Sequence, residues 1–488
     1  MNKEDQQEPE FASRIRMSSI ESFHFYSSNS EWPNSVISRC HFHGSVDMEL
    51  AKGAWQHILR RQKVSTWTLK DAALRPTWSV NDGKERLPEL AKESFHEVMI
   101  EKWPKDESTF QLPGFNERGL PKIAARDHVG FGLWCVHSKN ENRATLFFAC
   151  DHSLADGVAG MAVVREWMLA YNSLCNGADI DRGLPKFDWE RWKKRSRLGL
   201  LSWSFLKFIP CQAIGLFGAT KFIFRKFSTI EPKENHQPVD SEPSPGIAGR
   251  TISPEILRDL NDRAERLSVS ENSLLLTIAL RAMKRIRELA EADDHCDWAE
   301  RKWIRLVLPI GIRRIADRKL PCTNKTSLVQ IERTFDQVAN ADGAAQSIDR
   351  EVRIIMGFKL DHVFLIAIRL LSMIPPMLRF AARNQKSRGT AVFTNLGEPF
   401  RKTRACNFRD VGGLEFQDFD VCGPLRSGTP INIAWSTFKR NVGDELKTHG
   451  RVSLHFDRQL ISDQLGTAIV DAFEKELRDV AQFGGSGT

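Results

Sequence analysis

The chain has 488 residues, with 41% hydrophobic and 27% charged residues and a formal net charge of +8. This composition is ordinary for a globular protein and argues against wholesale disorder, and the length predicts two domains of about 200 residues each. We find no zinc-finger spacing, no glycine-rich RNA-binding signature and no helix-turn-helix pattern, so nucleic acid is not an expected partner. A basic surface also suits a polyanionic small ligand or an anionic membrane.

The cysteines and the N-terminus bear on the cellular compartment. The nine cysteines stand singly, without a Cys-x-x-Cys pair, and predict free thiols in a reducing environment. The first ten residues are polar and acidic, with no hydrophobic stretch behind a basic start, which argues against a secretory signal. We therefore expect a cytoplasmic protein.

Residues 1–18 are predicted to form a flexible tail, and residues 19–185 a first domain. The alternating run Ser35–His43 predicts a strand, and Asp47–Arg61 has the spacing of an amphipathic helix. His41 and His43 lie two residues apart on one face of that strand, a spacing that could hold a metal ion. No third ligand is in evidence, so we interpret them as ordinary strand histidines and expect no metal.

A hairpin follows, built from Val129–His137, a polar turn, and the almost continuously apolar run Ala144–Cys150. Such a run predicts a central strand covered on both faces. It leads directly into the loop Asp151-His152-Ser153-Leu154-Ala155-Asp156-Gly157, after which Met161–Tyr171 is predicted to be helical. A strand, a tight polar loop and a helix form the context in which reactive side chains are commonly displayed.

Residues 186–245 are predicted to be a crossover and linker between the domains. A basic cluster at 191–197 precedes an apolar, aromatic stretch that runs to Phe227, and several prolines follow. Basic residues beside aromatic ones suit a segment lying in the headgroup region of a membrane. The alternative, a crossover that packs against the protein itself, fits the composition equally well. Lys207, Pro210 and Lys221 argue against a transmembrane span.

Residues 246–488 are predicted to form a second domain. The pattern predicts strands at 249–253, 303–308, 431–438 and 451–456, and helices at 254–267, 274–289, 363–380 (broken at Pro375) and 461–480. Strands and helices alternate in both halves, so the predicted fold class is α/β.

His152 and Asp156 are the residues that we expect to carry the chemistry. A neutral imidazole can take a proton from a hydroxyl or amine at physiological pH, which makes that group nucleophilic toward a thioester carbonyl. Asp156 can instead hold the loop through a buried ion pair, for which Arg313 is the candidate partner. Gly157 would permit a close approach of backbone where a side chain would block a channel. The alternative is that His152 merely caps a helix in a surface loop.

This loop resembles the His-His-x-x-x-Asp-Gly motif of the coenzyme-A-dependent acyltransferase superfamily, which includes chloramphenicol acetyltransferase, condensation domains of nonribosomal peptide synthetases and wax ester synthase/diacylglycerol acyltransferases. It matches at every position but the first, where Asp151 stands. The resemblance implies that His152 is the catalytic base and that Asp156 is structural. It also implies two chloramphenicol-acetyltransferase-like α/β domains that form a V around a central channel, with donor and acceptor entering from opposite faces.

Four further blocks resemble the wax ester synthase branch in order and spacing. By that resemblance they contribute residues that line the channel or bind substrate, namely Trp134 in Gly132-Leu133-Trp134, Asn272 at the start of a helix, Asn324 after Leu308–Arg313, and Asn395 in Thr394-Asn395-Leu396-Gly397. Gly132 replaces the family's proline and Ser273 its aspartate. Asp151 places a potential anion beside His152, which would raise the pKa of the imidazole if the two approach.

We therefore expect an acyltransferase that uses an acyl-CoA or an acyl-carrier thioester as co-substrate and a hydroxyl or amine as acceptor, which would be lipidic in the wax ester synthase branch. No metal or redox cofactor is implied. One alternative is a condensation-type, amide-forming transferase that takes its acyl group from a carrier protein. Another is a non-catalytic member of the same fold that binds lipid or a partner. Independently of these alternatives, residues 186–227 are a candidate for peripheral membrane contact.

Overall fold

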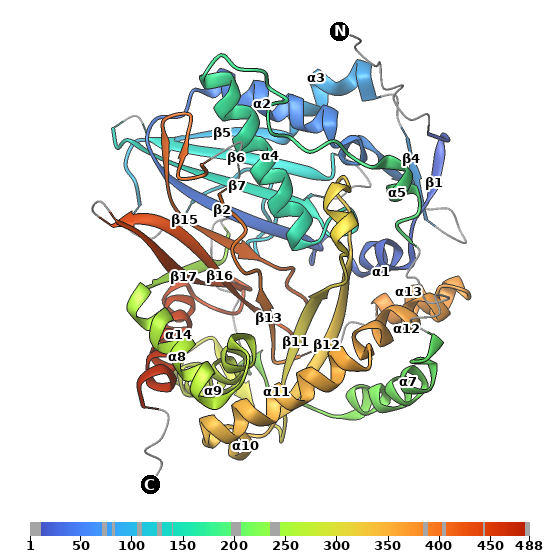
Figure 1. The fold of residues 1–488 in the computed structure, drawn as a ribbon, viewed down its shortest axis with the longest axis vertical. Coiled ribbons are helices and arrows are strands. Elements are labelled where there is room, and N and C mark those ends of the chain that lie inside the picture. The colour runs from blue at the N-terminus through green and yellow to red at the C-terminus, as the bar shows by residue number, and fades with distance from the viewer. Residues whose placement is uncertain are drawn as a thin grey trace.

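The computed structural model describes residues 11–70, 76–80, 83–104, 110–123, 129–138, 140–196, 206–234, 245–383, 389–402, 407–442 and 445–483. Two six-stranded mixed sheets lie one above the other in Figure 1, and each carries its own helices. The predicted class, α/β with two similar halves, is confirmed. Residues 1–10 of the expected tail, 197–205 of the crossover and 235–244 of the linker lie outside the described part of the chain.

The first sheet is antiparallel except at one edge, where its last two strands run parallel. Its order is β14 (Asp410–Val411), β15 (Leu414–Cys422), β2 (Ser35–His43), β7 (Arg143–Asp151), β6 (Phe131–Ser138) and β5 (Phe95–Ile100). Helices α2 (Met48–Arg61) and α4 (Gly157–Cys175) pack on one face through Trp55, Trp167 and Met168, and α3 (Gly83–Ser94) lies beyond them. Strand β7 is buried along almost its whole length, as its unbroken apolar run predicts.

The second sheet has the order β12 (Thr326–Arg333), β11 (Ile304–Gly311), β13 (Ala391–Asn395), β16 (Ile431–Val442), β17 (Glu445–Phe456) and β9 (Ile247–Ile252). Strand β13 runs parallel to both its neighbours, and the other pairs are antiparallel. The helices that pack with this sheet in a second core are α8 (Pro254–Leu267), α9 (Glu271–Ala292), α10 (Phe335–Ala339), α11 (Ala341–Gly357) and α14 (Asp463–Phe483).

Strand β15 comes from the second half of the chain but pairs with β2 in the first sheet. The expected boundary at 186–245 therefore does not separate the two sheets. A buried charge network fixes this exchange: Asp420 of β15 accepts hydrogen bonds from Arg39 of β2 at 2.6 Å and from Arg451 of β17 at 2.8 Å. Burial alone would raise the pKa of the Asp420 carboxyl, but the two guanidinium charges hold it well below its usual range.

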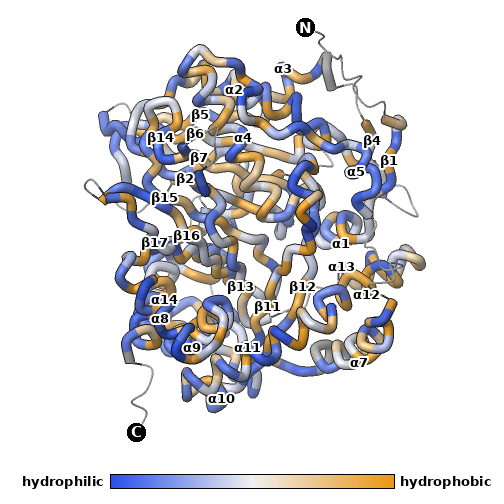
Figure 2. Tube along the Cα trace, in the orientation of Figure 1, coloured by the Kyte–Doolittle hydropathy of each residue, from blue (hydrophilic) through white to orange (hydrophobic). Residues whose placement is uncertain are grey.

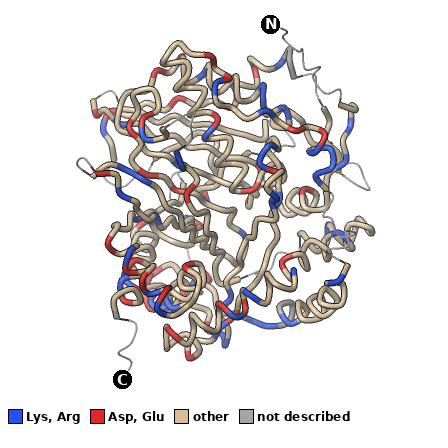
Figure 3. Tube along the Cα trace, in the orientation of Figure 1, with Lys and Arg blue, Asp and Glu red and all other residues tan. Residues whose placement is uncertain are grey.

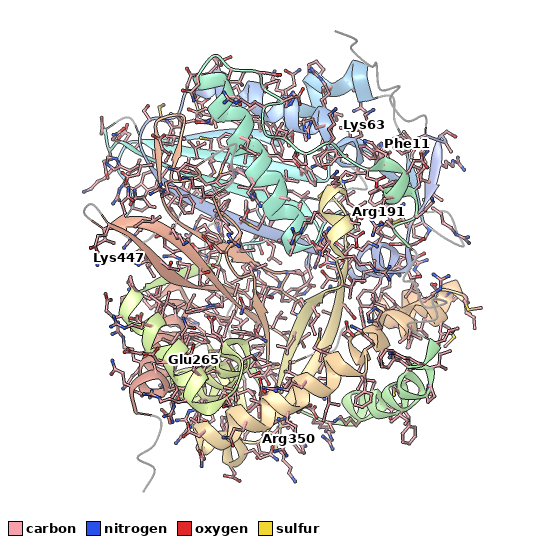
Figure 4. The ribbon with its side chains drawn as sticks, in the orientation of Figure 1. Phe11, Lys63, Arg191, Glu265, Arg350 and Lys447 are labelled. Carbon is pink, nitrogen blue, oxygen red and sulfur yellow. The ribbon has the colours of Figure 1, made fainter. Side chains whose placement is uncertain are left out.

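The segment 11–18, expected to belong to a flexible tail, is ordered against the first half. Strand β1 (Arg14–Arg16) pairs with β4 (Thr77–Ser79), which also pairs with β3 (Thr68–Lys70). The Phe11 ring, labelled in Figure 4, lies 5.3 Å from the rings of both Trp67 and Trp189. The tail prediction is wrong for these residues, because an aromatic side chain finds a cluster of tryptophans to pack against.

The crossover contains α5 (Trp189–Lys193), α7 (Ile209–Phe224) and β8 (Thr229–Pro232), which pairs with β10 (Cys296–Ala299). Helix α7 lies beside α12 (Val363–Leu371) and α13 (Pro375–Arg383), and the latter two pack against α1 (Ser19–Ser27). Within the described residues, no helix combines the length and the apolarity needed to cross a bilayer. The eight cysteines of the described residues are all free thiols, as predicted.

Candidate active site

His152 stands directly after the central strand β7, at the point where that strand leaves the first sheet. The backbone N–H of His152 donates to the carbonyl of Asn34 at 2.8 Å, and the loop closes at Asp156, which precedes the first residue of α4. The imidazole lines a cavity of about 100 Å³ between the two sheets. His152 is therefore more than a surface-loop cap, because its side chain lines a cavity between the two sheets.

The hydrogen bonds of the imidazole define which nitrogen can act as a base. Nδ1 lies 2.7 Å from the carbonyl oxygen of Ala155, an acceptor, so Nδ1 carries the proton and donates. The side-chain amide of Asn324 lies 3.2 Å from the same nitrogen but donates to the His152 carbonyl at 2.8 Å. This arrangement leaves Nε2 as the nitrogen with a lone pair for a ligand.

Burial lowers the pKa of the His152 imidazole to about 4. The protonated form is disfavoured because burial removes part of its hydration, and the hydrogen bond to Ala155 opposes this effect only in part. His152 is thus neutral at physiological pH, which is the form that a general base requires.

Asp151, the residue that replaces the first histidine of the motif, uses its carboxylate within the loop. Its Oδ1 accepts from the backbone N–H of Ser153 at 2.8 Å and from the Ser153 hydroxyl at 2.6 Å. The expected rise in the pKa of His152 depended on Asp151 approaching the ring; the Asp151 carboxylate binds Ser153 instead, and burial is the largest influence on the pKa of His152.

Asp156 connects the first half of the chain to the second. Oδ1 caps α4 by accepting from the Ala159 N–H at 2.8 Å and lies 2.8 Å from Nη2 of Arg313, so the expected ion pair is present. Oδ2 accepts from the backbone N–H of Lys325 at 2.7 Å and from the Thr326 hydroxyl at 3.2 Å. Burial raises the pKa of the Asp156 carboxyl, but Arg313 and the amides outweigh it and hold the pKa below its usual value.

Three of these partners lie in or beside the connection between β11 and β12. This connection extends from the second sheet toward the start of α4, as Figure 1 shows. Arg191, labelled in Figure 4, holds its far end through a 2.6 Å ion pair with Asp317. The connection therefore brings Asn324 and Arg313 to the His152 loop.

The second sheet and the residue after β13 give the cavity a lining that is mainly aliphatic. Its apolar members are Val307, Pro309, Leu328, Val392, Leu396 and Ala434, and its polar members are Thr326, Thr394 and Asn432. Gly157 lies on the same wall as His152, and a Cβ there would meet Leu396 at 3.6 Å, an ordinary contact distance. The protein's own packing therefore does not demand this glycine, and a side chain there would take up cavity space.

Two cationic or titratable residues in the cavity were not predicted from the sequence, namely His24 and Arg426. His24, on α1, is buried, and the centroid of its ring lies 4.1 Å from that of His152 at a 32° tilt. The Asn34 side chain links His24 to Arg426. Its amide nitrogen donates to Nδ1 of His24 at 2.9 Å, and its amide oxygen accepts from Arg426 at 3.2 Å. The capping box formed by Ser18 and Glu21 signals the start of α1, but no sequence pattern indicates that His24 meets His152.

Trp134, expected in the channel, lies elsewhere. Its ring belongs to a separate apolar cluster on the opposite face of the first sheet, stacks on His96 at 5.0 Å, and donates to the Pro113 carbonyl at 2.9 Å. Gly132 makes room for it, since a Cβ there would come within 2.7 Å of the indole. Trp134 is thus a core residue.

Asn272 and Asn395 bond to each other rather than to the cavity. The Asn395 amide donates to the Asn272 carbonyl oxygen at 3.2 Å, and Asn395 is exposed. Its neighbours Thr394 and Leu396 line the cavity instead. Of the four residues expected to line the channel, only Asn324 contacts His152.

His41 and two carboxylates form the one metal-sized cluster found among the described residues, and it excludes His43. His41 Nε2 lies 3.7 Å from Asp418 and from Asp420. Because Arg39 and Arg451 already neutralise Asp420, a cation at this position would meet two positive charges. The donor set does not suit a metal ion.

Comparison with protein-family models and with curated proteins finds no match for the chain. Solved structures of condensation domains are similar in fold. The first condensation domain of the calcium-dependent antibiotic synthetase, with a substrate analogue, has a TM-score of 0.64 at 11% identity, covering 97% of both chains. The starter condensation domain of rhizomide synthetase, solved as a point mutant with C8-CoA, has a TM-score of 0.60 at 11% identity, covering 96% of this chain and 95% of that one.

The epimerization domain from the third module of tyrocidine synthetase B has a TM-score of 0.60 at 13% identity, covering 97% of this chain and 98% of that one. These likenesses span nearly the whole chain. The protein therefore has the condensation-domain fold, with two chloramphenicol-acetyltransferase-like lobes, as the motif resemblance implied.

We predict that Asp156→Ala lowers the free energy of unfolding by about 3–5 kcal/mol, because it leaves Arg313 without its buried partner. The matched control is Asp471→Ala, which removes an aspartate–arginine pair from a side chain that is 51% exposed and should cost at most about 1 kcal/mol. Chemical denaturation of the three proteins measures both values. Equal stability of Asp156→Ala and the wild type would show that Asp156 does not hold the two halves together.

Proposed function

We propose that this protein is an acyltransferase that moves an acyl group from a thioester, with acyl-CoA as the expected donor, to a hydroxyl or amine. The observation that carries the proposal is a neutral imidazole whose Nδ1 is bound to its own loop and whose Nε2 is left for a ligand, at a largely apolar cavity between two sheets. The fold supports it, since a similar starter condensation domain was solved with C8-CoA.

In the proposed reaction, Nε2 of His152 accepts the proton of the acceptor while the acceptor's oxygen or nitrogen bonds to the thioester carbonyl carbon. The tetrahedral intermediate then expels the thiolate, and the imidazolium returns its proton to the sulfur. An ester or amide and a free thiol leave, and His152 is neutral again. The low pKa of the imidazole favours this return, because the imidazolium is then a stronger acid than that of a free histidine.

Asp156 has a positioning role in this scheme, since its two oxygens are occupied by Arg313, Thr326 and backbone amides. Arg426 lines the same cavity and supplies a positive charge that can stabilise the oxyanion of the intermediate. The aliphatic wall favours an apolar acyl chain or a lipidic acceptor over a polar one. We further propose that the crossover makes a peripheral contact with a membrane through residues 186–227.

The alternative is amide formation from a carrier-protein thioester, which the likeness to condensation domains supports comparably. A panel of acyl-CoAs and acyl carrier proteins, each combined with alcohols and amines, separates the two when the products are identified by mass spectrometry. Turnover of acyl-CoA supports the proposal, and turnover of the carrier thioester alone supports the alternative. No turnover with any pair would favour a non-catalytic protein.

We predict that His152→Ala reduces turnover by about 10²–10⁴-fold and leaves the fold intact, because general-base assistance is lost. Asp151→Asn should reduce turnover by less than about tenfold, since Asp151 contributes hydrogen bonds to Ser153 rather than proton transfer. Steady-state rates with one active donor and acceptor pair test both variants. Wild-type turnover by His152→Ala would refute the mechanism.

His24 is proposed to be a positioning residue that keeps water from the His152 ring. In the wild type, activity should be constant above the pKa of His152 and fall as the pH drops through about 4. His24→Ala admits water, so the pKa of His152 should rise toward about 6.5 and the acid limb of the rate profile should move to higher pH. His24→Phe keeps a ring in place and should retain the wild-type limb. Superimposable profiles for all three proteins would contradict this role.

A further inference from the structure

Helices α7, α12 and α13 lie at one edge of the molecule in Figure 1, and their traces contain many hydrophobic (orange) residues in Figure 2. Half of the sixteen large apolar side chains that the structure describes as exposed lie on these helices or in the turn between α12 and α13, namely Ile209, Ile214, Phe217, Leu370, Met373, Ile374, Met377 and Phe380. Their exposed fractions run from 48% at Met377 to 81% at Phe217. We call this set the apolar face. A contiguous exposed apolar patch on a protein marks a contact surface.

The apolar face is a composite of two segments distant in the sequence. Helix α7 packs inward through Gly215, where a Cβ would come within 2.7 Å of Val363 on α12, and Gln212 donates to the carbonyls of Phe358 and Lys359. The residues of α13 that point outward follow helical spacing, while Leu378 and Ala382 of the same helix are buried. Each segment thus exposes apolar side chains on one side while its other side packs against the protein.

The charge around the apolar face has a single sign. The sequence contains no Asp or Glu from 191 to 230 or from 362 to 397. Figure 3 shows only basic charges along α7, α12 and α13, and the exposed basic residues that flank the apolar face are Lys207, Lys221, Lys226, Arg369, Arg379 and Arg383. A second copy of this face would meet like charge, whereas an anionic lipid surface is complementary.

We propose that the apolar face docks on an anionic lipid bilayer, with its phenylalanine, isoleucine and methionine side chains in the headgroup region and its lysines and arginines on the phosphates. Apolar side chains flanked by basic ones are the pattern of helices that lie in the plane of a membrane interface. The first part of the crossover does not take part, since Trp192 is buried within the protein, where Arg195 lies over its ring and Trp67 meets it edge-on.

The face adjoins the catalytic cavity through α1. The Phe364 ring of α12 lies 5.3 Å from that of Phe23, and the hydroxyls of Ser372 and Ser19 lie 3.0 Å apart. Ile20 on α1 lines both the main cavity and a smaller cavity of about 20 Å³ between α1 and α12. We infer that the apolar substrate reaches the cavity from the membrane. This inference rests on the proposed function, whereas docking of the apolar face does not depend on it.

The test of docking is flotation of the full-length protein with vesicles of phosphatidylcholine alone or mixed with phosphatidylserine. We expect binding to the mixed vesicles that weakens with added salt. Lys226→Glu with Arg379→Glu should lower the partition coefficient by at least about fivefold for each reversed charge. Phe217→Ser with Phe380→Ser should lower it by about tenfold or more. The controls Lys92→Glu on α3 and Leu446→Ser on β17 alter exposed residues elsewhere and should bind as the wild type does.

Equal binding of all variants, or no binding to anionic vesicles, would overturn docking. Sedimentation that shows a dimer dispersed by the two phenylalanine substitutions would assign the face to a second copy instead. For substrate delivery, the face variants should turn over a water-soluble acyl donor normally and a vesicle-borne one more slowly. Equal slowing with both donors would refute delivery, and absence of turnover with either by the wild type would refute the proposed function while leaving the flotation result standing.

Discussion

The carboxylate of Asp156 is the contact on which the candidate site depends. Its two oxygens bind the first turn of α4 in one half and Arg313, Lys325 and Thr326 in the other. His152 is four residues earlier in the same loop, so the position of its ring relative to the second sheet is set by these bonds. A buried carboxylate tolerates such a place only when it is fully paired, and here the pairing lowers its pKa despite burial.

A second buried carboxylate, Asp420, fixes the frame around that loop. Its pairing with Arg39 and Arg451 ties β15 and β2 of the first sheet to β17 of the second, and β15 also contributes Val421 to the cavity. The two halves are therefore joined by strand β15 and by the ion pairs of Asp156 and Asp420.

Sequence patterns predicted the helices and strands whose bounds depend on neighbouring residues. Helix α8 begins at Pro254 and ends at Leu267, the bounds that the sequence pattern predicts. Strand β2 likewise spans Ser35–His43, as the alternation of its residues predicts. Strand β15 was missed because a bulge between Phe416 and Asp418 breaks its alternation and its partner lies far away in the sequence. His24 was missed for a related reason, since only the tertiary packing of α1 places it on His152.

The errors at Trp134 and Asn395 have one physical cause, the two-residue period of a strand. Leu133 faces the helices, so Trp134 must face the opposite side of the sheet, and Val392 and Thr394 face the cavity, so Asn395 faces away. The family motifs predict these positions from sequence order alone, whereas the alternation of each strand determines which face of the sheet a side chain occupies.

The central claim is that His152 is a neutral base that presents Nε2 to the cavity. Heteronuclear NMR of the His152 ring nitrogens across a pH titration measures this directly. We predict that the His152 ring is protonated on Nδ1, which donates to the Ala155 carbonyl, and that its pKa is about 4. An Nε2-protonated ring, or a pKa at or above that of a free histidine, would contradict it.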